Sequence, residues 1–265
     1  MSTKIKSMIV SSALIFASGA SFMFAGWHSG SAEKLVAANA LPAVSLSAET
    51  GAATGSVQGR VIFEGLVPKP QKLLVVKDVE VCSKIGHSDE RLIVGPRKGI
   101  QNAVIALIGV QGGKPMSALG SAFVLDQKAC RYTPHVLVVA KDSTVEILNS
   151  DGVLHNIHTF SKINRPVNLA HPKAVPKLKI AFKKPEKVAV KCDIHGWMSA
   201  WIVVAEHPYY AVTDANGAFV LSDVPPGTYA ITSWQEALGE QNAVVTVTPG
   251  GTATIDFVYT GKKKS

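Results

Sequence analysis

A short segment in the last third of the chain holds three side chains that bind soft metal ions. Cys192, His195 and Met198 follow one another at steps of three residues and offer a thiolate, an imidazole and a thioether. A second imidazole, that of His155, comes just after a turn between two expected strands. Two imidazoles and one thiolate, with a distant methionine on the axis, form the ligand set of a mononuclear copper centre that transfers electrons. These four residues are therefore predicted to bind one copper ion per chain.

Other uses of the same residues have less support. Zinc also binds two His and one Cys, but a methionine in the fourth place favours copper. Catalysis by Cys192 with a histidine base would need an Asn, Gln or Asp partner, and no recognisable local signature places one. We therefore expect that the chain is not an enzyme. Two alternatives stay open: a protein that binds and delivers copper without carrying electrons, and an interaction protein whose loop holds no metal.

Strands must position these ligands, because no amphipathic helical pattern longer than about ten residues competes with period-two patterns along the chain. Short apolar runs alternate with Asn, Asp, Gly and Pro, which predicts a sandwich or barrel. After residue 207, Asn216-Gly217 predicts the turn of a hairpin, and further strands follow the Pro225-Pro226-Gly227 turn. This second module is small, so we expect it to pack on the first and to borrow the strand at 57–63. The strands expected before it are 57–63, 72–76, 103–110, 122–125, 135–139, 144–148, 156–160, 177–182, 187–191 and 201–204.

The ligand motifs resemble those of the cupredoxins, the family of plastocyanin and amicyanin. Cys-x-x-His-x-x-Met at 192–198 is similar to the short amicyanin-type ligand loop, and Asn-x-x-Gly-x-x-His-Asn at 149–156 resembles the segment with the first histidine ligand. The resemblance covers about 133–206. It implies a blue-copper electron carrier in which Met198 is the weak axial ligand. It also implies that Asn156 ties the two ligand loops together by hydrogen bonding near the thiolate.

The position of His195 in a loop predicts that one edge of its ring lies near solvent. Gly196, Trp197 and Pro134 would then form an apolar rim through which a redox partner couples. The partner expected is a redox protein, either a cytochrome or an oxidoreductase.

The C-terminal module resembles a carboxypeptidase regulatory-like, or transthyretin-like, β-sandwich through Thr-Asp-x-x-Gly-x-Phe at 213–219 and Val-Pro-Pro-Gly-Thr-Tyr at 224–229. The expected fold is all-β, a cupredoxin-like Greek-key β-sandwich followed by a small transthyretin-like β-sandwich. The predicted parts are a signal peptide or N-terminal anchor at 1–40, a flexible linker at 41–55, the copper domain at 56–206, the regulatory-like sandwich at 207–260 and a basic tail at 261–265.

The N-terminus has the order of a secretory signal, with Lys4 and Lys6 before an apolar stretch at 8–26 and then small residues. The protein is thus expected to be periplasmic or otherwise exported, and anchored in the membrane if that stretch is not cleaved. An oxidising compartment allows cysteines to pair. Cys82 and Cys130 have ordinary neighbours and are predicted to form a disulfide, which leaves Cys192 for the metal.

Charge narrows the choice of partner. The formal net charge is +8, and +6 remains when the three Lys and one Glu of residues 1–40 are left out. This basic balance favours an acidic protein partner or a membrane surface. The basic residues are mostly scattered, so nucleic acid is not expected as a partner. With 47% hydrophobic and 17% charged residues, the chain has enough apolar material for a folded core, which excludes disorder of the whole chain.

Overall fold

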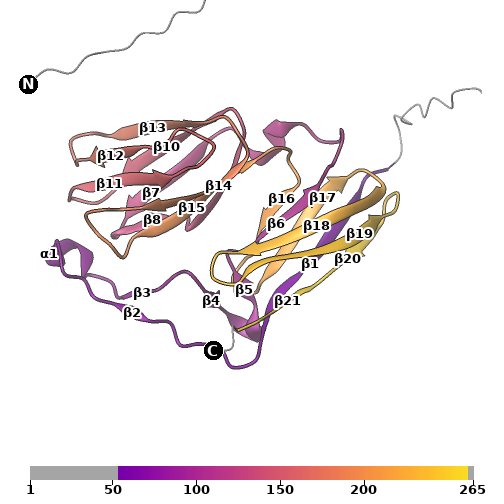
Figure 1. The fold of residues 1–265 in the computed structure, drawn as a ribbon, viewed down its shortest axis with the longest axis horizontal. Helices are drawn as coiled ribbons and strands as arrows, with labels where there is room; N and C mark the ends of the chain where they lie inside the picture. Colours follow the sequence, from indigo (N-terminus) through magenta and orange to yellow (C-terminus); the bar gives the residue numbers. More distant parts are fainter. Residues whose placement is uncertain (1–52, 262–265) are drawn as a thin grey trace, which may run out of the picture. The chain divides into compact units, whose positions relative to one another are not determined.

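The computed structural model describes residues 53–261, and strands make up nearly all of their regular structure (Figure 1). Helix within this range is confined to the four-residue α1 (Val79–Cys82) and two short 3-10 turns, Pro96–Lys98 and Met116–Leu119. The predicted all-β fold class is confirmed. None of these helices is long and apolar enough to span a membrane. The predicted signal peptide or anchor, with its apolar stretch at 8–26, lies outside the described residues, as do nearly all of the predicted linker and tail.

Two sheets form the first sandwich, with strand orders β13-β10-β7-β8 and β12-β11-β14-β15-β9. Side chains from both sheets share one core. The strands are β7 (Phe123–Lys128), β8 (Arg131–Thr133), β9 (Val136–Ala140), β10 (Ser143–Asn149), β11 (His155–Phe160), β12 (Asn168–His171), β13 (Lys177–Phe182), β14 (Glu186–Lys191) and β15 (Ser199–Ala205).

Alternation of apolar residues explains this core. In β10, Val145 and Ile147 are buried while their neighbours are more exposed, and Val188 and Val190 repeat the pattern in β14. Successive side chains of a strand point to opposite faces, so a period of two places these four residues between the sheets. They belong to one cluster that also contains Cys192 and Met198 at one end. The proposed ligand loop is thus anchored in the core of the first sandwich.

A second pair of sheets has strand orders β16-β6-β18-β19 and β17-β1-β20, with β21 also paired to β1. Its members, together with the short pair β4 and β5, come from both ends of the described chain (Figure 1). They are β1 (Gly55–Glu64), β4 (Ile93–Val94), β5 (Ile100–Gln101), β6 (Val104–Ile108), β16 (Tyr210–Val212), β17 (Ala218–Val224), β18 (Gly227–Gln235), β19 (Gly239–Val247), β20 (Thr252–Thr254) and β21 (Phe257–Thr260).

The sheets divide the chain differently from the predicted boundaries. β6 and all but the first residue of β1 fall within the range 56–206 assigned to the copper domain, yet both strands pair with strands of the C-terminal module. Borrowing of the strand at 57–63 was expected, whereas borrowing of the strand at 103–110 was not. A module of about 55 residues is too small to bury two sheet faces alone. The first sandwich is therefore an insertion between β6 and β16.

The turn at Asn216-Gly217 forms, but the predicted hairpin around it does not. Gly217 has a φ of 73° and its N–H donates to the carbonyl of Asp214. Beyond this turn the chain changes sheets, because β16 pairs with β6 while β17 pairs with β1. An Asn-Gly turn therefore marked the reversal correctly without identifying the strands that pair.

Residues 65–91, called here the tethered segment, leave β1, reach the first sandwich and lead back to β4. They contain β2 (Lys72–Leu73), α1 and β3 (His87–Ser88), and only two residues of the strand expected at 72–76 pair in a ladder. A disulfide joins Cys82 of α1 to Cys130, with their Cα atoms 5.3 Å apart. Arg131 Nη2 also donates to the Gly86 carbonyl at 2.7 Å. The predicted disulfide is present, and it holds this segment against the first sandwich.

Candidate metal centre

The loop between β14 and β15 carries three of the four predicted ligands. These strands pair antiparallel up to Lys191 and Ser199, so residues 192–198 must reverse the chain at the end of the sandwich. Two backbone hydrogen bonds close the loop: Met198 N–H donates to the His195 carbonyl at 2.8 Å, and Cys192 N–H donates to the Met198 carbonyl at 3.3 Å. The loop is therefore fixed by its own backbone.

The fourth predicted ligand, His155, is the first residue of β11, which pairs with β14. Its Nδ1 lies 2.9 Å from Nδ1 of His195, and the latter lies 3.8 Å from Sγ of Cys192. One ligand atom from each of these three residues lies within 4.8 Å of the other two. All three side chains are at most 2% exposed, as is that of Met198. Strand pairing thus brings residues 40 positions apart into one buried group.

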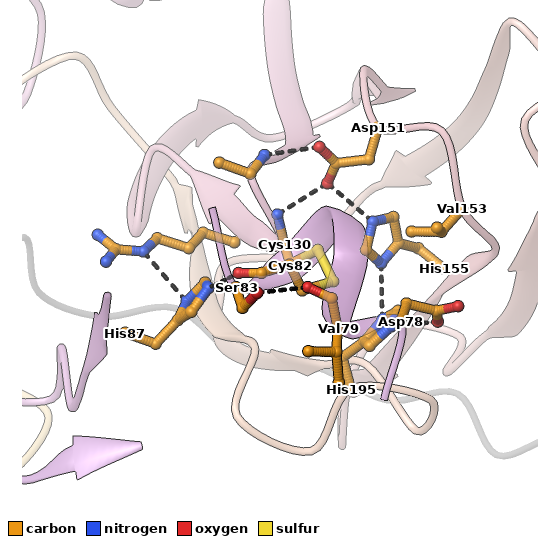
Figure 2. The surroundings of a disulfide bond; sticks show 12 residues. Asp78, Val79, Cys82, Ser83, His87, Cys130, Asp151, Val153, His155 and His195 are labelled. Atoms are coloured by element: carbon orange, nitrogen blue, oxygen red, sulfur yellow. Dashed lines mark hydrogen bonds and ion pairs between the residues drawn. A yellow bond between two sulfur atoms is a disulfide. The ribbon is translucent and has the colours of Figure 1, made fainter. Parts of the chain in front are cut away.

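Each imidazole is held by a carboxylate on the side away from this group (Figure 2). His155 Nε2 lies 2.9 Å from Asp151 Oδ2, and His195 Nε2 lies 2.8 Å from Asp78 Oδ2. Asp151 is itself fixed by the backbone N–H groups of residues 129 and 130. A carboxylate partner requires the proton on Nε2, which turns the lone pair of Nδ1 toward the centre.

Two facing Nδ1 lone pairs 2.9 Å apart repel each other unless a positive charge lies between them. A proton on His155 can supply that charge, because the pKa of His155 is raised to about 8. Burial alone would lower this pKa, but hydrogen bonds to Asp151 and to the Cys192 sulfur outweigh burial. The pKa of His195 is lowered, mainly by burial, with the charge of His155 adding to the effect.

The environment of Cys192 favours the thiolate. Burial would raise the pKa of its thiol, but a hydrogen bond from His155 and several backbone N–H groups lower it overall. One of these is the His195 N–H, 3.4 Å from Sγ. A thiolate and two imidazole nitrogens this close together match the ligand chemistry of a copper or zinc ion, and Met198 on the same loop adds a soft thioether. The residues present therefore fit the copper centre that the sequence predicts.

Asn156 lies between the two ligand loops, as its predicted role requires. Its Oδ1 accepts from the Asp193 N–H at 2.6 Å, and its Nδ2 donates to Asn168 Oδ1 at 2.6 Å. The residue after His155 is thereby bonded to the residue after Cys192. Asn156 can therefore fix the distance between the strand and the loop that carry the ligand atoms.

The expectation of a solvent-exposed edge on His195 is wrong, because the ring is completely buried. Asp78 of the tethered segment covers its Nε2, and the Trp197 ring lies 5.1 Å from it, centroid to centroid. Trp197 is half-buried rather than part of an open rim, and its Nε1 donates to the Cys130 carbonyl at 3.1 Å. Gly196 and Pro134 remain exposed.

Asp78 and Asp151 are the site residues that sequence reasoning missed. Asp151 lies four residues before His155 in the same turn, so its proximity to a predicted ligand was an available signal. Asp78 lies 117 residues before His195, and nothing near it in the sequence points to an imidazole. Asp78 reaches the site because the Cys82–Cys130 disulfide holds the tethered segment against the first sandwich.

Comparison with known proteins gives one family model and several solved structures. Residues 199–260 match the model of the carboxypeptidase regulatory-like domain. No match was found among curated proteins.

Solved structures similar to the chain include a copper-containing nitrite reductase from Thermus scotoductus SA-01, at 23% identity and a TM-score of 0.28, covering 37% of this chain and 24% of that one. An oxidised proline-to-glycine variant of amicyanin has 22% identity and a TM-score of 0.29, over 32% of this chain and 84% of that one. A purple cupredoxin from Nitrosopumilus maritimus has 19% identity and a TM-score of 0.27, over 31% and 99%. Both families that the sequence motifs resemble are thus among the matches.

Proposed function

We propose that the protein binds one copper ion through His155 Nδ1, Cys192 Sγ and His195 Nδ1, with Met198 as the axial ligand, and carries single electrons between redox proteins. The observation that carries this proposal is the buried group of two facing Nδ1 atoms and one thiolate sulfur, each imidazole held from behind by a carboxylate. Bound copper would accept one electron as Cu(II) and release it as Cu(I).

The chain's own residues would keep the geometry the same in both oxidation states. Asp151 and Asp78 hold the two Nε2 protons, so the Nδ1 lone pairs stay directed at the centre and no proton has to move with the electron. The loop hydrogen bonds and Asn156 fix the sulfur relative to the rings. Groups held this tightly need little rearrangement, which favours fast electron transfer.

Burial also favours a carrier over an enzyme and over a copper-delivery protein. With every predicted ligand at most 2% exposed, a substrate has no free access to the centre. A protein that hands copper to a partner would be expected to expose a ligand for exchange, whereas His195 is covered by Asp78. Reversible one-electron reduction separates the two functions, because delivery of copper does not require it.

The visible and EPR spectra of the purified protein after addition of Cu(II) test the proposal. A thiolate-to-copper charge-transfer band with narrow copper hyperfine splitting is expected, and Cys192→Ser should abolish it. His155→Ala should also abolish it, whereas the matched control His158→Ala, three residues along the same strand, should keep it because His158 bonds to Asp193 instead. A protein without the band, or a band that survives Cys192→Ser, would overturn the proposal.

We further propose that the protein is exported, and that 8–26 anchors it in a membrane if the segment stays attached. Support comes from the order of basic, apolar and small residues at the N-terminus and from the Cys82–Cys130 disulfide, which persists in oxidising compartments. The mass of the protein purified from its native cells tests the anchor: loss of about forty N-terminal residues would mean cleavage.

A further inference from the structure

A groove of about 510 Å³ runs along the open side of the first sandwich, next to β12 and β13. These are the outermost strands of their two sheets on that side. Apolar side chains line it, and two of them face solvent: Ile163 is 56% exposed and Leu169 is 40% exposed. Arg165, Lys183 and Lys184, called here the rim residues, also line it. The groove thus combines exposed apolar side chains with a group of basic ones.

The rim residues are part of the most basic stretch of the described chain. Residues 162–187 contain eight Lys or Arg and a single acidic residue, Glu186. Both carboxylate oxygens of Glu186 accept from the backbone N–H groups of residues 162–164, which shapes the loop at the groove. Lys177 and Lys179 are paired with Glu146. Between residues 53 and 261 no ion pair involves the three rim residues Arg165, Lys183 and Lys184, so their charge is available to a partner.

Lysines on outer strands often serve only to prevent edge-to-edge aggregation. Lys177 and Lys179 of β13 fit that explanation. The three rim residues do not, because they lie in the loops that follow β11 and β13 rather than on a free edge. Prevention of aggregation also does not explain the exposed Ile163 and Leu169, since exposed apolar side chains on a strand edge promote association. A surface with an apolar centre and a charged rim is typical of a protein interface.

At Leu169 the groove lies one strand away from β11, the strand that begins with His155, whereas Arg165, Lys183 and Lys184 follow the ends of β11 and β13 that are remote from the ligands. β12 pairs with β11, so that Leu169 is opposite Ile157 and His171 is opposite His155. Asn168 of β12 also donates to Asp193, the residue after Cys192, at 2.7 Å. By contrast, the edge of His195 is closed by Asp78. A partner seated in the groove would therefore be connected to the centre through hydrogen-bonded backbone.

We propose that this groove docks the acidic face of a redox protein partner, and that the electron passes between partner and copper through β12 and β11. This inference rests on the proposed function, because it names the surface that such a carrier would use. In one direction the step takes one electron from Cu(I) and reduces the oxidised centre of the partner by one electron, and the reverse step restores Cu(I). No covalent bond is made or broken, and no proton is required.

Small redox probes test where the electron enters. The copper-loaded full chain is oxidised by anionic hexacyanoferrate(III) at 0.1 M ionic strength, where charges act over about 10 Å. The variant Arg165→Glu/Lys183→Glu/Lys184→Glu should slow this reaction about 10-fold or more, since local charge steers association by that factor. The matched control Lys69→Glu/Lys72→Glu/Lys84→Glu puts the same charge change on the tethered segment and should have little effect. The opposite ranking of the two variants would overturn the proposal and place entry at the tethered segment.

A synthetic peptide of alternating Glu and Leu tests the class of partner. Its binding to the full chain, followed by NMR shifts, should involve 162–184 and weaken several-fold in Ile163→Ser/Leu169→Ser. Binding to phosphatidylglycerol vesicles but not to the peptide would mean a membrane surface and overturn the proposal. Cys192→Ser should still bind the peptide, so loss of the copper centre and loss of the docking surface are distinguishable.

Discussion

Asp78 offers the sharpest test of the site's construction, because it lies far from the ligands in the sequence and touches only one of them. Its carboxylate accepts from Nε2 of His195 at 2.8 Å, and its backbone has φ 47° and ψ 43°. Asn and Gly tolerate this left-handed conformation, so Asp78→Asn and Asp78→Gly should fold. Both variants test the carboxylate without adding backbone strain.

The size of the effect follows from the contact. A charge-assisted hydrogen bond contributes about 1.5–3 kcal/mol, and the Asp78 side chain is 33% exposed, so the lower end applies after screening. Asn keeps a neutral hydrogen bond of about 0.5–1 kcal/mol. Copper affinity should therefore fall about 2- to 5-fold in Asp78→Asn and about 10-fold or more in Asp78→Gly, at about 1.4 kcal/mol per factor of ten.

Competition of the protein with a chelator of known affinity, for Cu(II) and for Cu(I), measures both values. Glu80→Gln is the matched control, because it removes one negative charge from the same segment at an exposed position two residues further on. Its copper affinity should match that of the unmodified protein. If all three variants bind copper as tightly as the unmodified protein, Asp78 does not position His195. If all three lose affinity by the same factor, the effect is a general change of charge.

Three other changes test the rest of the structure. Burial would lower the pKa of His135, but Glu236 raises it overall, so this pair stabilises the fold below about pH 6.5 and its contribution is lost as the pH rises through the raised pKa. Urea unfolding of Glu236→Gln should therefore show a loss of unfolding free energy of about 1–2 kcal/mol at pH 6 and a smaller loss at pH 9. Equal losses at the two pH values would contradict this reasoning. Replacing Cys82 and Cys130 together by Ala should reduce the unfolding free energy by about 2–4 kcal/mol, because their bond closes a long loop. It should also weaken copper binding, since Asp78 loses its tether, and unchanged affinity would mean that the segment holds its place without the bond. Gly217→Ala should lower the unfolding free energy by about 1–3 kcal/mol, because φ is 73° and a Cβ would meet the Val61 carbonyl oxygen at 2.2 Å. The visible copper spectrum of the folded fraction should stay the same. A thermal melt measures the loss of stability, and the visible spectrum tests the copper site.

The local parts of this site could be read from the sequence because a three-residue step within one short loop leaves few geometries. A hairpin loop closing on β14 and β15 must bring Cys192 and His195 to the same end of a sheet, whatever surrounds them. His155 could be added because it begins a strand just after a turn, and strand ends of one sandwich lie together. The Cys82–Cys130 disulfide could be predicted because the chain has three cysteines and Cys192 was the one predicted to bind the metal.

The surroundings of the site could not be read in this way, because long-range packing decides them. Burial of His195 depends on Asp78, whose approach is set by a bond between two other residues and not by any local pattern. The sheet to which β1 and β6 belong is likewise decided by partners far along the chain. Period-two alternation predicts that a strand has a buried face, but not which other sheet packs against that face. The same limit explains the Asn216-Gly217 turn, which reverses the chain between two sheets.

Insertion of the first sandwich into the second has a consequence for how the molecule is made. β1 is the first described strand to be synthesised, yet it pairs with β21 through Val61 and Phe257, 196 residues later. The inserted sandwich draws its strands from one continuous stretch, so it can assemble while its host is still incomplete. Pairings over such separations form slowly because the entropy of closing the chain is lost before the contacts are gained. A chain cut after Glu206 would leave β1 and β6 as unpaired strands exposed to aggregation. A chain that begins after β6 would avoid these unpaired strands, but it would lack Asp78 and leave Cys130 without its partner Cys82.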